Sequence, residues 1–155
     1  MRFYLEDIIE KADGTSVKSL TGYATQDEAE TAFHREVSYP TQFDDTAFVR
    51  CSVINEHGGQ IMIDTWKKDV PVDPETGEPV VEETTKYYLS QLKFKADETT
   101  ESYLFDFETQ NDAFYAYHNG LSDDMESNLY IALMSKMEDK FGNEIKRRYW
   151  EKSFD

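Results

Sequence analysis

The chain is poor in the residues that make covalent, metal-bound or membrane-embedded folds. It has one cysteine, seven glycines and four prolines among 155 residues. A single cysteine, Cys51, excludes an internal disulfide framework and a multi-cysteine zinc site. No apolar run is long enough to cross a membrane, and acidic residues interrupt the N-terminal segment where a signal peptide requires apolar ones. We therefore expect a cytoplasmic location without membrane contact.

Basic residues are also scarce, since 16 lysines and arginines face 32 acids and give a net charge of −16. Residues 69–85 contain six acids and no base, so the densest negative charge lies in the middle of the chain. Binding to nucleic acid through phosphate neutralisation needs a basic footprint. The sequence has one basic cluster, at residues 146–148, with Lys152 beyond it. We expect no direct nucleic-acid binding.

The sequence repeats itself without a gap at an offset of 84 residues. Residues 2–68 pair with residues 86–152, and 17 of the 67 pairs are identical, where average composition gives roughly four. The repeat predicts a first unit over residues 1–68, an acidic and proline-rich connector over 69–85, and a second unit over 86–155. Such units are expected to pack as a pseudo-twofold pair.

Each unit has the pattern strand, strand, helix, strand, strand. An Asp13-Gly14 pair predicts a type I′ hairpin turn, and its copy, which has Glu98 in place of the glycine, is expected to form another turn type. Thr25 and Thr109 are helix N-cap candidates. Residues 47–53 alternate between apolar and other residues, as a strand with one buried face does. The fold class is thus α+β, with a four-stranded antiparallel sheet and one helix per unit; the strand order remains open.

The connector has three prolines, which favour an extended and semi-stiff chain. A long hairpin with its tip at residues 74–79 is the alternative. Its acids, Asp73, Glu75 and Glu78, are spaced closely enough to suggest Ca²⁺, but the glycine and ligand pattern of a calcium loop is missing. We expect solvated charge there, and no metal.

No catalytic or phosphate-binding motif occurs in the chain, so we expect no enzyme activity and no cofactor. His34 and His118 occupy the same position in the two repeats, and a metal site or pH switch is the functional alternative to half-buried side chains beside each helix. Trp66 and Trp150 are expected to pack over a helix end, although a stacking platform is conceivable. Cys51 alternates with apolar residues and is expected to be buried.

The clearest functional signal is a difference between the two repeats. At five positions an aromatic residue of the second unit replaces a polar residue of the first. Aromatic residues on a surface indicate a contact with something that covers them, which is either the first unit, the connector or a partner protein. The candidate protein-binding residues are Phe94, Tyr103, Phe105, Phe114 and Tyr115, which replace Glu10, Ser19, Thr21, Glu30 and Thr31.

Short repeated motifs carry a resemblance to a group of known proteins. They are Ala12-Asp13-Gly14-Thr15, a helix that ends in A-x-x-A-[FY]-H at His34 and His118, and a glycine turn followed by a strand and tryptophan. This pattern resembles small uncharacterised proteins of bacteriophages and mobile elements in gut Firmicutes, which typically hold one such unit. The resemblance implies a phage-type origin and transfers no activity.

Two function classes follow from these observations. The first is a non-catalytic accessory or structural factor of phage or mobile-element type, acting in a bacterial or phage-infected cell and binding a protein through its second unit. The alternative is an acidic inhibitor that imitates nucleic acid to block a host nuclease or defence system. The near balance of acids and bases within each unit weakens that alternative.

Overall fold

The computed structural model describes residues 2–68, 74–77 and 86–153. Most of the predicted connector lies outside the described residues, as do Asp73 and Glu78 of the calcium alternative. The predicted α+β class is confirmed, with a ββαββ order in each half. The first unit consists of β1 (Phe3–Lys11), β2 (Ser16–Tyr23), α1 (Gln26–Ser38), the 3-10 helix η1 (Tyr39–Gln42), β3 (Thr46–Asn55) and β4 (Gln60–Lys67).

The second unit repeats this arrangement at the offset that the sequence predicts. Every strand begins and ends 84 residues after its counterpart, and the strand registers shift at equivalent places. The two antiparallel sheets have the orders β2-β1-β3-β4 and β6-β5-β7-β8. The internal duplication is therefore confirmed. The elements of the second unit are β5 (Tyr87–Lys95), β6 (Thr100–Phe107), α2 (Gln110–Glu126), β7 (Tyr130–Asp139) and β8 (Glu144–Glu151).

Both helices start as their sequences predict but end at different points. The side chains of Thr25 and Thr109 cap them by accepting hydrogen bonds from backbone N–H groups three residues later. In the first unit Pro40 follows the helix within the η1 turn, where a proline cannot donate an α-helical hydrogen bond. Its counterpart is Asp124, so α2 continues to Glu126 and is four residues longer.

The first hairpin of each unit corrects two predictions. Gly14 has a φ of +89°, but Asp13 does not have a positive φ, whereas a type I′ turn requires two such residues. The bonds Gly14 N–H to Lys11 C=O and Lys11 N–H to Thr15 C=O define a type I turn followed by a bulge. The copy forms the same two bonds, with Glu98 at a φ of +69°. The missing glycine therefore changes the conformational cost of the turn and leaves its type unchanged.

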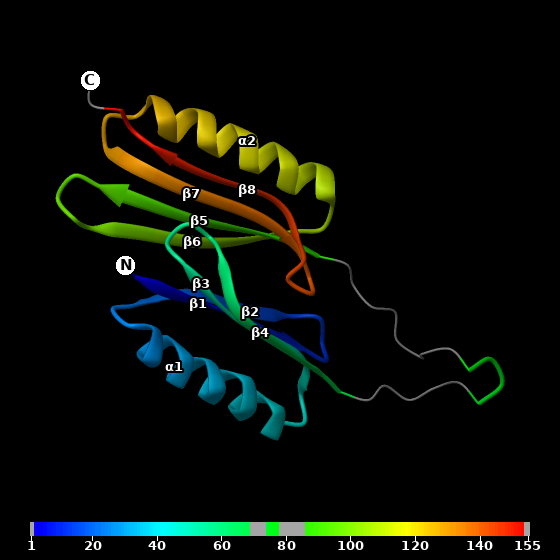
Figure 1. The fold of residues 1–155 in the computed structure, drawn as a ribbon. Coiled ribbons are helices and arrows are strands. Elements are labelled where there is room, and N and C mark those ends of the chain that lie inside the picture. Colours follow the sequence, from blue (N-terminus) through cyan, green and yellow to red (C-terminus); the bar gives the residue numbers. More distant parts are fainter. Residues whose placement is uncertain (1, 69–73, 78–85, 154–155) are drawn as a thin grey trace.

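The molecule has four layers, with a helix on the outside of each sheet and the two sheets packed face to face (Figure 1). The prediction that Val49, Cys51 and Val53 face one core is confirmed, because they lie beneath α1. The opposite face of β3 is buried as well, since it meets the other sheet. Each unit has its own core beneath its helix, and a third apolar cluster joins the units through Tyr4, Leu20, Ile54, Leu92, Phe94, Met134 and Tyr149.

The hairpin tips also hold the two units together. A β-carbon added to Gly58, between β3 and β4, would lie 2.8 Å from Cδ of Arg147 in the second unit. A β-carbon added to Gly142, between β7 and β8, would clash with Cδ1 of Ile63 in the first unit. His57 stacks on Tyr149 across the contact, with ring centroids 4.2 Å apart. No role for His57 is predicted from the sequence, because its counterpart is Phe141.

The equivalent hairpin turns provide a matched stability test. A side chain in the left-handed region costs about 1–2 kcal/mol, and glycine avoids this cost while losing some chain entropy on folding. Glu98→Gly should therefore raise the free energy of unfolding by up to about 1 kcal/mol. Gly14→Ala should lower it by about 1 kcal/mol. Urea denaturation measures both, and a destabilised Glu98→Gly variant would contradict the strain at this turn.

Candidate functional site

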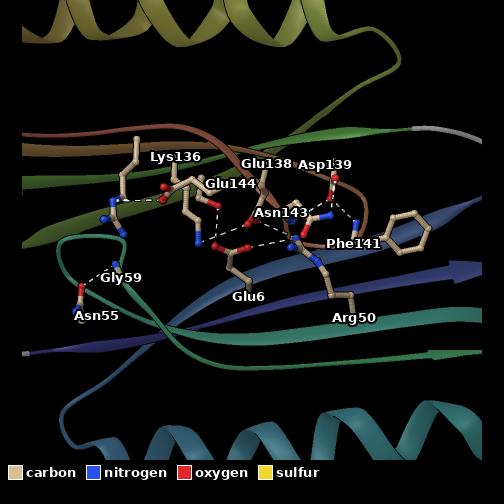
Figure 2. A network of polar contacts seen from close by, with 12 residues as sticks. Glu6, Arg50, Asn55, Gly59, Lys136, Glu138, Asp139, Phe141, Asn143 and Glu144 are labelled. Carbon is tan, nitrogen blue, oxygen red and sulfur yellow. Dashed lines mark hydrogen bonds and ion pairs between the residues drawn. The ribbon is translucent and has the colours of Figure 1, made fainter.

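A network of buried charges lies between the two sheets (Figure 2). The Nη2 atom of Arg50, on β3, is 2.9 Å from Oε1 of Glu138 on β7 and 3.3 Å from Oε2 of Glu6 on β1. Nζ of Lys136 is 3.5 Å from the other Glu138 oxygen. The side chain of Ser90 donates a hydrogen bond of 3.0 Å to Glu6. Two cations and two acids, almost fully buried, thus connect the units.

The network shifts the pKa values of its two carboxyl groups in opposite directions. Burial, followed by the charge of Glu138, raises the pKa of Glu6 to about 8. Burial alone would raise the pKa of Glu138 too, but Arg50 and the hydrogen bond from Glu6 outweigh it and lower that pKa to about 2. One carboxyl therefore holds its proton near neutral pH and the other stays ionised. Like charges in one buried site commonly have this effect.

A second ion pair extends the charged contact toward one end of the sheets. Nζ of Lys140 is 2.8 Å from Oε2 of Glu10, and both side chains are more than nine-tenths buried. Lys140 also lies over the ring of Phe48, with 4.5 Å between Nζ and the ring centroid. Glu10 is thus not the surface residue that the comparison of repeats suggested. Its aromatic counterpart, Phe94, packs in the apolar cluster between the units.

The remaining candidates from the sequence have simple structural settings. Cys51 is buried beneath α1, as predicted, and its thiol contacts Asp7, while burial raises the pKa of this thiol. Both tryptophans pack against the core beneath their helix. His34 and His118 are exposed, which corrects the expected half-burial, because both lie on the solvent side of their helix flank. Among the described residues, no group of acidic, histidine or cysteine side chains has the arrangement of a metal site.

The structure divides the four remaining aromatic candidates into two groups. Tyr103 and Phe105 are exposed on β6, where their rings stack 5.9 Å apart. Phe114 and Tyr115 lie on α2, with 44% and 71% of their surface exposed. Phe114 contacts Lys146 of β8, which is the strand at the opposite edge of the sheet from β6. The aromatic candidates therefore do not form one continuous patch.

The α2 group borders a groove that the sequence did not reveal. The groove lies between α2 and β8 and has a volume of about 650 Å³, which is within the range of ligand-binding clefts. The ring of Phe114 contacts His118 at 4.5 Å, and Nζ of Lys146 lies 5.3 Å from the centroid of Phe114. We call this region the α2–β8 surface and define it by the exposed residues Phe114, Tyr115, His118, Met125, Lys146 and Arg148.

The same region of the first unit has the opposite chemistry. The two cations of the α2–β8 surface are replaced there by Met62 and Asp64, and the two exposed aromatics by Glu30 and Thr31. The earlier end of α1 also removes the turn that carries Met125. Sequence comparison found the aromatics and the basic cluster separately, and only the pairing of α2 with β8 shows that they share a surface.

Comparisons with known proteins add no relative to this picture. The sequence matches no family model, and neither the curated proteins nor the solved structures include a significant match. Among the described residues, no helix has the length and apolar character needed to cross a membrane. The function must therefore be argued from the residues of the surface and from the differences between the two units.

The raised pKa of Glu6 predicts a specific dependence of stability on pH. Folded Glu6 keeps its proton up to about pH 8, whereas the unfolded side chain releases it near its ordinary pKa of 4.5. The folded state then binds more protons between these values, so its stability falls as the pH rises through them. Glu6→Gln should remove this part of the fall. Urea denaturation between pH 5 and about pH 9 should show the variant gaining stability relative to wild type.

Asp7→Asn is the matched control for this experiment. Burial raises the pKa of Asp7 to about 6, so its stability difference from wild type should develop between about pH 4 and pH 6 and then level off. A Glu6→Gln profile parallel to that of wild type up to pH 8 would show that Glu6 is already ionised in the folded protein.

Proposed function

We propose that the protein is a non-catalytic binding module that holds a protein partner on the α2–β8 surface of its second unit. The observation that carries this proposal is the exposure of Phe114 beside Lys146, with Tyr115 next to Phe114 on α2 and Arg148 on β8. The first unit has neither an aromatic nor a basic residue at any of these four positions. Exposed aromatic and basic side chains are typical of the residues that dominate binding energy in protein interfaces. The equivalent surface of the first unit serves as a comparison, because it has the same backbone but lacks these aromatic and basic side chains.

Charge complementarity points to the kind of partner. The α2–β8 surface carries two exposed cations on a protein with a net charge of −16, so it attracts an acidic partner locally although the molecule as a whole is acidic. An acidic segment with one or two apolar side chains fits both the cations and the aromatic rings. A basic partner would instead be attracted to other parts of the molecule. The origin in a phage or mobile element stays a prediction that rests on short motifs.

A displayed peptide library can test this binding mode with the partner still unknown. Peptides selected on the wild-type protein are expected to be acidic with apolar anchors. The double variant Phe114→Ala and Tyr115→Ala should weaken their binding by about tenfold or more, measured by fluorescence polarisation. Its free energy of unfolding should change by no more than about 0.5 kcal/mol for each surface substitution.

The first unit provides the control variants. Glu30→Ala with Thr31→Ala changes the equivalent positions and should leave peptide binding unaltered. Lys146→Met with Arg148→Asp introduces the residues of the first unit and should abolish the preference for acidic peptides. Selected peptides that bind the Phe114 and Tyr115 double variant as tightly as wild type would place recognition elsewhere. Selection of basic peptides would instead favour the nucleic-acid mimic.

A further inference from the structure

The two units are related by an approximate twofold axis, which passes close to the hydrogen bond between two equivalent residues. Ser90 is the counterpart of Glu6 at the offset of 84 residues, and the two side chains are bonded to each other across the contact. In a symmetric pair every other contact occurs twice, once on each side of the axis. Each side, or arm, can therefore be compared with the other, residue by residue.

The two arms have opposite chemistry at equivalent positions. In the first arm Arg50 of the first unit meets Glu138 of the second through an ion pair. In the second arm the counterparts of these residues are Met134 and Ile54, which pack in the apolar cluster between the units. Other positions of the charged arm differ as well. Glu10 and Lys136 correspond to Phe94 and Ser52 in the apolar arm, and Lys140, the partner of Glu10, corresponds to Glu56.

The charged residues of one unit face oppositely charged residues only when a first unit pairs with a second unit. In a pair of two first units, Arg50 would face Ile54 in both arms and lose its Glu138 partner. In a pair of two second units, Glu138 would face Met134 twice. In both pairs Arg50 and Glu138 keep only the partner of their own unit, Glu6 or Lys136, while Glu10 and Lys140 lose each other. Burying charges with fewer partners is unfavourable, although a complete buried pair is itself close to neutral for stability. The charged arm thus opposes like pairs more than it stabilises the unlike pair.

We propose that the inner sheet face of each unit is a recognition surface that accepts the other unit and rejects a second copy of itself. The ion pairs Arg50–Glu138 and Glu10–Lys140 determine this choice, while the apolar arm supplies affinity without discrimination. Specificity is then a difference between the correct pair and the wrong ones. This inference is independent of the proposed partner at the α2–β8 surface.

The full chain can be used to test the pairing. Residues 75–77 are replaced by a protease site, and the folded protein is cleaved there, unfolded in urea and refolded by dilution. Native mass spectrometry then separates the three possible pairs, because the two units differ in mass. The wild-type sequence should give the unlike pair, with each like pair below about one twentieth of the total, because the unlike pair has twice the statistical weight and we expect at least a tenfold preference, about 1.4 kcal/mol per pair.

Giving both arms the same residues should remove the preference for the unlike pair. The variant carries the apolar arm's residues in both arms, through Glu6→Ser, Glu10→Phe, Arg50→Met, Lys136→Ser, Glu138→Ile and Lys140→Glu. Its units should pair in nearly statistical proportions. Abundant like pairs from the cleaved wild type, or exclusive unlike pairing by this folded variant, would overturn the proposal.

A reciprocal variant guards against a sixfold variant that does not fold. Ile54→Glu, Met134→Arg, Glu56→Lys and Phe94→Glu place both ion pairs in both arms and should also permit like pairs. Folding of the uncleaved variant is first checked by its circular dichroism. If this variant folds and keeps exclusive unlike pairing, the two ion pairs do not determine the choice.

Discussion

The structure depends on the burial of both faces of each sheet. A helix covers one face of the four strands in each unit, and a unit of about 67 residues has no other element with which to cover the second face. The sheets therefore cover each other. This constraint explains why Phe48, Ser52 and Ile54 are buried although they alternate with the core residues of β3. It also places charged residues in an interior where each must find a partner.

Duplication within one chain frees the two copies to diverge in different ways. Inside the contact, the basic side chains of Arg50 and Lys136 lie beside the acids Glu6 and Glu138. On the outside no such pairing is needed, and the α2–β8 surface carries aromatic and basic side chains that the first unit lacks. One copy can thus preserve the scaffold while the other changes its surface, with the same backbone beneath both.

Sequence reasoning predicted the local features of this fold well, because the repeat places each element in two independent contexts. The helix starts at Thr25 and Thr109 follow from a side chain and a backbone group three residues apart. The burial of Glu10 and the role of His57 could not be predicted, because both depend on how one sheet lies on the other. The type of the second hairpin was missed for a different reason. Its hydrogen bonds outweigh the backbone strain at Glu98.

Strand β8 contributes side chains both to the α2–β8 surface and to the contact with the first unit. Lys146 and Arg148 point toward α2, whereas Arg147 and Tyr149 alternate to the opposite side and contact the hairpin tip of the first unit at Gly58 and His57. A ligand that fixes the outer side of β8 would therefore also restrict the strand that grips the first unit. Thermodynamic linkage is reciprocal, so a tighter contact between the units would strengthen ligand binding to the same extent.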